Sequence, residues 1–173
     1  MNNEAVRQLV RFIALLLVQI LICNHVHVFG FINPDLYLMA LLLLPMTMPK
    51  SAQYGIAFAT GFIVDIFDMT FGFHAMASLI IIALRPWTIK LFSINKKKTD
   101  EAAPSPKNRD FKWLLTYTLF IVLIHQFIIC MLETSSFNRF GMTLLSVAIN
   151  TGITSLLILC TEYIFIPNKS NFN

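Results

Sequence analysis

Long apolar stretches with few charges constrain this chain of 173 residues more than any other feature. A helix needs about 20 mostly apolar residues to cross the hydrocarbon core of a bilayer. Apolar residues make up 57% of the chain and charged residues 13%, whereas soluble domains average roughly 45–50% and about 25%. We therefore predict an all-α polytopic membrane protein, a bundle of six transmembrane helices at about residues 9–29, 32–48, 52–69, 73–92, 112–132 and 141–166.

The lysines and arginines indicate how these segments are oriented, because such residues are retained on the cytoplasmic side of a membrane. They occur at the N-terminus, near Lys50, between the fourth and fifth predicted helices, and at Lys169 in the tail. The turn at 133–140 holds only Arg139. An even number of helices with both termini in the cytoplasm gives this alternation, so it favours six helices over five.

The whole chain, residues 1–173, is predicted to form a single integral membrane domain with one linker-like segment. This cytoplasmic basic loop, at about residues 93–111, is charged, contains two prolines and shows no apolar periodicity. We interpret it as a solvated loop that fixes the topology. The alternative is a docking site for a cytoplasmic partner or for anionic lipid.

Patterns that would indicate an enzyme, a cofactor or nucleic-acid binding are missing from the sequence. It contains no HExxH, GxSxG or Walker motif. The cysteines lie inside apolar stretches at spacings that fit no zinc or redox motif. The net charge of +4 comes from basic residues between the apolar segments. We therefore predict a protein that is not an enzyme, holds no metal or cofactor, and contacts lipid rather than nucleic acid.

Two carboxylates near the end of the third predicted helix need an explanation, because ionisable residues are expensive inside a bilayer. Ala57, Gly61, Asp65 and Asp68 are spaced so that they share one helical face. Small residues on such a face let another helix approach closely. We predict a buried packing face that ends in a polar core at Asp65. Asp68 is interpreted as a hydrated or capping residue near the outer interface.

The residues that follow predict a tight turn. Gly72 lies between two apolar segments and suits a conformation with positive φ, after which a new helix begins near His74. We interpret His74 as an interfacial histidine, with a proton-sensitive ligand as the alternative.

Further polar residues lie inside the later segments. Arg85 either extends along its own stem to the cytoplasmic interface or forms an intramembrane ion pair with Glu162, which lies at a similar depth. His125, Gln126 and Asn150 are single polar positions that we expect to form hydrogen bonds between helices.

Two stretches together resemble the MreD family of rod-shape-determining membrane proteins. They are "NPDLYLMALLLLPM", residues 33–46, and "GIAFATGFIVDIFDMTFGFHAMASLIIIAL", residues 55–84. The resemblance is carried by a proline that begins the second predicted helix, a glycine-containing third helix with an aspartate near its end, and a glycine before the fourth. The family's pattern therefore points to a site of polar-core or partner-coupling residues: Pro34, Gly61, Asp65, Gly72 and His74. Asp68 is an additional acid that departs from this pattern, and we include it in the site.

The resemblance implies a non-enzymatic scaffold in the bacterial inner membrane that acts in cell shape and peptidoglycan synthesis. Its expected partner is an MreC-like bitopic protein. The expected complex also contains MreB, a RodA-type glycosyltransferase and its transpeptidase, bound directly or indirectly. The family is similar in helical architecture to the substrate-binding subunits of vitamin uptake transporters. That similarity gives an alternative function, a small-molecule-binding subunit in which Asp65 lines a pocket.

Overall fold

The computed structural model describes residues 3–23, 33–92, 110–133 and 140–165. The part of the chain that it describes is helical and contains no strand. The helices are α1 (Asn3–Leu21), α2 (Tyr37–Leu42), α3 (Lys50–Asp68), α4 (Phe73–Phe92), α5 (Phe111–Glu133) and α6 (Phe140–Phe165). The prediction of an all-helical protein is therefore confirmed.

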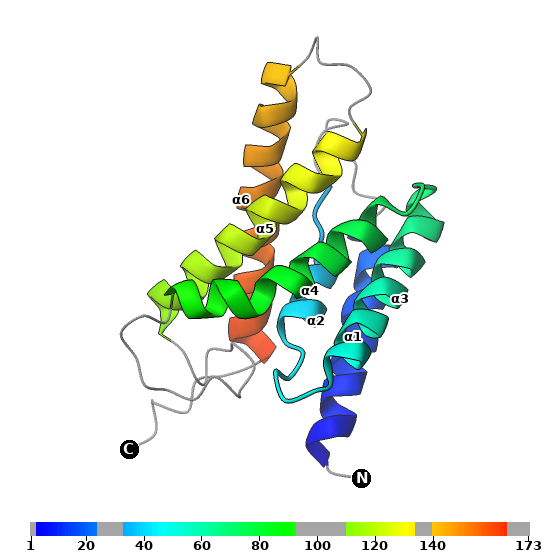
Figure 1. The fold of residues 1–173 in the computed structure, drawn as a ribbon, viewed down its shortest axis with the longest axis vertical. Helices are drawn as coiled ribbons and strands as arrows, with labels where there is room; N and C mark the ends of the chain where they lie inside the picture. Colours follow the sequence, from blue (N-terminus) through cyan, green and yellow to red (C-terminus); the bar gives the residue numbers. More distant parts are fainter. Residues whose placement is uncertain (1–2, 24–32, 93–109, 134–139, 166–173) are drawn as a thin grey trace.

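The helices form two groups that α4 connects (Figure 1). Helix α4 packs against α3 on one side and α5 on the other, and α5 packs against α6. Helix α1 contacts α2 and α3. The short α2 lies in the middle of the molecule, and all six of its residues are buried.

Three of these helices, α4, α5 and α6, are long and apolar enough to cross a membrane. In α1 the apolar part is shorter, Leu9–Leu21. Large apolar side chains also lie exposed on the outer faces of several helices, among them Phe58, Phe62, Leu119, Leu123 and Leu145. Soluble proteins rarely expose continuous apolar surface on this scale, so these faces suit contact with lipid tails.

The predicted second transmembrane helix, at residues 32–48, is wrong. Helix α2 covers only Tyr37–Leu42, which is about 9 Å at a rise of 1.5 Å per residue, against roughly 30 Å of hydrocarbon. Pro34 and Pro45 interrupt the segment and Pro49 follows it, and the residue before a proline is driven away from helical geometry. The residues of α2 are apolar because protein surrounds them on all sides.

The direction of the helices alternates along the chain. In Figure 1, α1, α3 and α5 run towards the upper end, whereas α4 and α6 return to the lower end. The lower end therefore holds Lys50 at the start of α3, Lys90 in the last turn of α4 and Lys112 in the first turn of α5. We call it the lysine end. The opposite end, with the α3–α4 turn at residues 69–72, is called the aspartate end. The basic loop predicted at 93–111 lies mostly outside the described residues.

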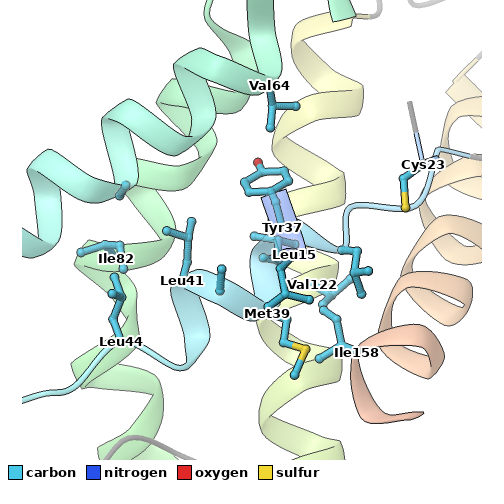
Figure 2. Close-up of a cluster of buried hydrophobic side chains, with 14 residues drawn as sticks. Leu15, Cys23, Tyr37, Met39, Leu41, Leu44, Val64, Ile82, Val122 and Ile158 are labelled. Carbon is cyan, nitrogen blue, oxygen red and sulfur yellow. The ribbon is translucent and has the colours of Figure 1, made fainter. Parts of the chain in front are cut away.

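The apolar core surrounds α2 (Figure 2). Tyr37 and Met39 of α2 lie among Leu15 of α1, Val122 of α5 and Ile158 of α6, and all five side chains are buried. The short helix is thus in contact with side chains from both groups of helices, and it fills the space between them.

Helices α3 and α4 approach each other closely at Gly61. A Cβ atom on Gly61 would lie 2.5 Å from the Ala75 Cα atom and 2.5 Å from the His74 carbonyl oxygen. Ala57, one turn earlier on α3, is also fully buried. The predicted face of small residues is therefore a helix-packing face, as its spacing indicated.

Replacement of Gly61 by alanine should push α3 and α4 apart. Because the new methyl group would meet backbone atoms, we expect a loss of about 1–3 kcal/mol of stability, the range typical of overpacked cores. The measurement is the melting temperature of the purified protein in detergent. Gly55→Ala, on the same helix, is the matched control, because no atom lies within 4 Å of the new Cβ there. Equal melting temperatures for the two variants would contradict this account of the packing.

Candidate functional site

Asp65 joins the end of α3 to the beginning of α4. Its carboxylate is buried, with 2% of the residue exposed. One oxygen, Oδ1, accepts hydrogen bonds from the Thr70 hydroxyl (2.5 Å) and the His74 backbone N–H (3.0 Å). The other, Oδ2, accepts from the Ala75 backbone N–H at 2.9 Å. The first N–H groups of a helix have no partner within the helix, so Asp65 supplies partners to the start of α4.

The turn between these helices has the backbone that the sequence predicts. Gly72 has a φ of 87°, and Met69, which follows α3, has a φ of 56°. Glycine adopts positive φ without a steric penalty. This turn returns the chain so that His74 reaches Asp65, nine residues earlier in the sequence.

His74 lies among three carboxylates. Its Nδ1 atom is 3.1 Å from Asp65 Oδ1, and its Nε2 atom is 3.8 Å from both Asp35 Oδ1 and Asp68 Oδ2. The residue is 5% exposed, so His74 lies inside the protein among these carboxylates and not on its surface. Asp68 itself is partly exposed at the end of α3, which agrees with its predicted place near the edge.

Asp35, just before α2, extends the network into the centre of the molecule. Its Oδ2 atom accepts a hydrogen bond from Gln126 Nε2 at 3.0 Å and lies 3.3 Å from His125 Nδ1. The other ring nitrogen of His125, Nε2, is 2.7 Å from the Tyr37 hydroxyl. The polar core, as we define it, consists of Asp35, Tyr37, Asp65, His74, His125 and Gln126.

The sequence analysis missed Asp35 and Tyr37 as site residues. Asp35 was included in an expected membrane helix, although an acid inside an apolar stretch is itself a signal of a buried polar site. His125 and Gln126 were expected to form hydrogen bonds between helices, and this prediction is confirmed. The described residues include no group of histidine, cysteine, aspartate or glutamate side chains that could hold a metal ion.

Side chains also complete the hydrogen bonds of the backbone that leads into α2. Gln19 of α1 donates to the Pro34 carbonyl at 3.2 Å and accepts from the Tyr37 N–H at 3.2 Å. Asn150 accepts from the Asn33 N–H at 3.0 Å, so this hydrogen bond joins α6 to the segment that precedes α2. Thr154 accepts from the Asp35 N–H at 3.3 Å. Helices α1 and α6 thus hold the entry to α2 in place, and Pro34 lies within this held segment.

Arg85 performs the corresponding role at the other end of α2. Its Nη2 atom donates to the carbonyl oxygens of Leu42 (2.6 Å) and Leu44 (2.5 Å). The last carbonyl groups of a helix have no partner within it, and a basic side chain can supply one. Arg85 is fully buried, so it does not extend to the interface.

The structure does not bring Arg85 and Glu162 into an ion pair. Both side chains are buried. Each has a coulombic interaction with Tyr117, a fully buried residue of α5. Several buried polar atoms nearby have no hydrogen-bond partner in the described part of the chain. They are Arg85 Nε and Nη1, the hydroxyls of Tyr117, Thr118, Thr151 and Ser155, and Glu162 Oε2; His125 Nδ1, in the polar core, is another such atom.

Comparisons of the chain with protein-family models, with curated proteins and with solved structures find no match.

Removal of the Asp65 charge should destabilise the α3–α4 junction. In Asp65→Asn one acceptor oxygen is replaced by an NH₂ group, which cannot accept from the N–H groups of α4. Hydrogen bonds to charged groups contribute about 1.5–3 kcal/mol, and we expect a loss of that order in thermal unfolding. Asp68→Asn, three residues away and partly exposed, is the control and should change stability much less. A larger loss in the control would refute the assigned capping role.

Arg85 should be essential to the short helix. We expect Arg85→Met to lower the free energy of unfolding by about 3 kcal/mol, because two carbonyls are left without their donor in a buried site. Lys90→Met removes a basic residue from an exposed position in the last turn of the same helix. The comparison of the two melting temperatures in detergent checks the prediction, which fails if both variants melt alike.

Proposed function

We propose that this chain is a non-enzymatic scaffold of the bacterial cell-wall elongation complex, placed in the cytoplasmic membrane and acting in cell shape and peptidoglycan synthesis. The observation that carries the proposal is that the Asp65 carboxylate is hydrogen-bonded within its own chain. Both of its oxygens accept hydrogen bonds from the start of α4 or from the turn that precedes it. An acid held in this way fixes helix packing.

The rest of the polar core supports the same role. Its members form contacts from α2 to α4 and from α2 to α5, and their side chains are buried. A catalytic group must touch its substrate, whereas these groups touch one another. Such a network holds several helices in one arrangement, which is what a protein that presents a fixed surface to partners requires.

The orientation follows from the positions of the lysines. With the lysine end in the cytoplasm, as the retention of basic residues predicts, the aspartate end faces the outside. An MreC-like bitopic protein, which has one membrane helix and an external domain, can contact both the apolar flanks and the aspartate end. MreB is then expected at the cytoplasmic side. A RodA-type glycosyltransferase and its transpeptidase join directly or through the MreC-like protein.

One observation favours the alternative, a small-molecule-binding subunit of an uptake transporter. The unpartnered buried atoms of Arg85, Tyr117 and Glu162, with hydroxyls of α5 and α6, are groups that a polar ligand could satisfy. In that case the ligand site lies near Arg85 and not at Asp65, whose oxygens are already in use.

Co-purification tests the proposed function. The tagged protein is co-expressed with the MreC-like protein of the same genome, extracted in mild detergent and purified. We expect the MreC-like protein to co-purify with the wild type and with Gly55→Ala. Recovery should decrease with Asp65→Asn in fractions that elute as a single folded species, because the α3–α4 junction is altered.

Two outcomes would contradict the scaffold proposal. Failure of the MreC-like protein to co-purify with the folded wild type removes its basis. Recovery of an ATPase module or a bound metabolite from host membranes supports the transporter alternative instead.

A further inference from the structure

The two nitrogens of the His74 ring both face carboxylates. Nδ1 is 3.1 Å from Asp65 Oδ1, and Nε2 is 3.8 Å from Asp35 Oδ1 and from Asp68 Oδ2. An ionised carboxylate can only accept hydrogen bonds, and a neutral imidazole has only one N–H to donate. In its neutral form the ring would therefore direct a lone pair at acidic oxygens. An imidazolium has two N–H groups: Nδ1–H donates to Asp65, and Nε2–H faces Asp35 and Asp68 at ion-pair distance, beyond hydrogen-bond length.

The charges around His74 favour the same state. Asp65 and Asp68 face it from α3, and Asp35 faces it from the segment before α2. The ring centroid of Tyr37 on α2 lies 6.0 Å from that of His74, and the ring centroid of His125 on α5 lies 6.3 Å from it. Glu133, at the end of α5, has coulombic interactions with His74, Asp35 and Asp68. Among the described residues, histidines are the basic side chains within ion-pair distance of Asp35 and Asp65. A proton on one of these rings is therefore the positive charge that can balance the acids.

His125 provides a contrast within the same network. Its Nδ1 atom faces Asp35 Oδ2 at 3.3 Å, but its Nε2 atom is 2.7 Å from the Tyr37 hydroxyl, which can donate to it. The Ser78 hydroxyl in turn donates to the Tyr37 oxygen at 3.4 Å. The His125 Nδ1 atom has no hydrogen-bond partner in the described part of the chain. His74 is thus the ring whose two nitrogens both face carboxylates, and the geometry calls for an additional proton there.

We propose that His74, together with Asp35 and Asp65, is a proton-binding site that opens towards the aspartate end through Asp68. The Asp68 side chain, 22% exposed, is the member of the group in contact with solvent. The bound proton holds Asp35, and with it the entry to α2, against α3 and α4. Loss of the proton leaves Nδ1–H on Asp65 and turns the Nε2 lone pair towards Asp35, which loosens that contact. The site does not depend on the proposed function.

The first test measures the proton directly. The full-length protein is labelled with ¹⁵N-histidine, reconstituted into lipid vesicles and examined by NMR at pH 7. His74 should show two protonated ring nitrogens. His74→Gln and His125→Gln assign the signals. A bare ring nitrogen on His74 at this pH would overturn the proposal.

The second test measures what the proton holds in place. The melting temperature in detergent is followed across about pH 5 to 9, the range in which imidazoles titrate. The stabilisation is present while His74 is protonated, so the wild type should lose several degrees as the pH rises. His74→Gln should flatten this dependence.

A control separates His74 from the two histidines that lie outside the described residues, His25 and His27. The double variant His25→Gln and His27→Gln should keep the pH dependence of the wild type. If the dependence persists in His74→Gln, or disappears in the control, the bound proton does not hold the entry to α2.

Discussion

The structure depends on one constraint, the hydrogen bonding of an interrupted backbone in an apolar interior. Residues 33–44 pass through the centre of the molecule with only the six residues of α2 in helical form. An unpaired N–H or C=O group there costs several kcal/mol, because neither water nor lipid can satisfy it. Side chains from three neighbouring helices supply the missing partners: Gln19, Arg85, Asn150 and Thr154. Much of the buried polarity in this chain exists because its second segment is not a continuous helix.

The same constraint explains the placement of two buried charges. Arg85 lies at the C-terminal end of α2, where carbonyl groups concentrate partial negative charge, and Asp35 precedes its N-terminal end. Each charge is favoured by the end of the helix that it faces. Asp35 in turn needs cationic or donor partners, and His74, His125 and Gln126 provide them. The short helix thus links the Arg85 contacts at one end to the polar core at the other.

The sequence predicts local features of this arrangement well and its long-range contacts poorly. The fourth helix agrees with its predicted bounds, and the spacing of Gly61 and Asp65 correctly indicates a packing face that ends in a buried acid. Both follow from helical periodicity alone. The second helix fails because an apolar run has the same composition whether lipid or protein surrounds it. The pairing of Asp35 with His125, 90 residues later, depends on the fold and leaves no local pattern.

The two polar regions lie at different depths, and this separation bears on what the protein can do. On α4, His74 and Arg85 are 11 residues apart, or about 16 Å along the helix. Between them Ile81 and Ile82 of α4 pack in buried layers with apolar residues of the neighbouring helices, Leu42, Ile121, Val122 and Ile158. A proton that enters beside Asp68 therefore meets an apolar layer before it reaches Arg85. Such a layer separates the polar core from the Arg85 contacts at the other end of α2.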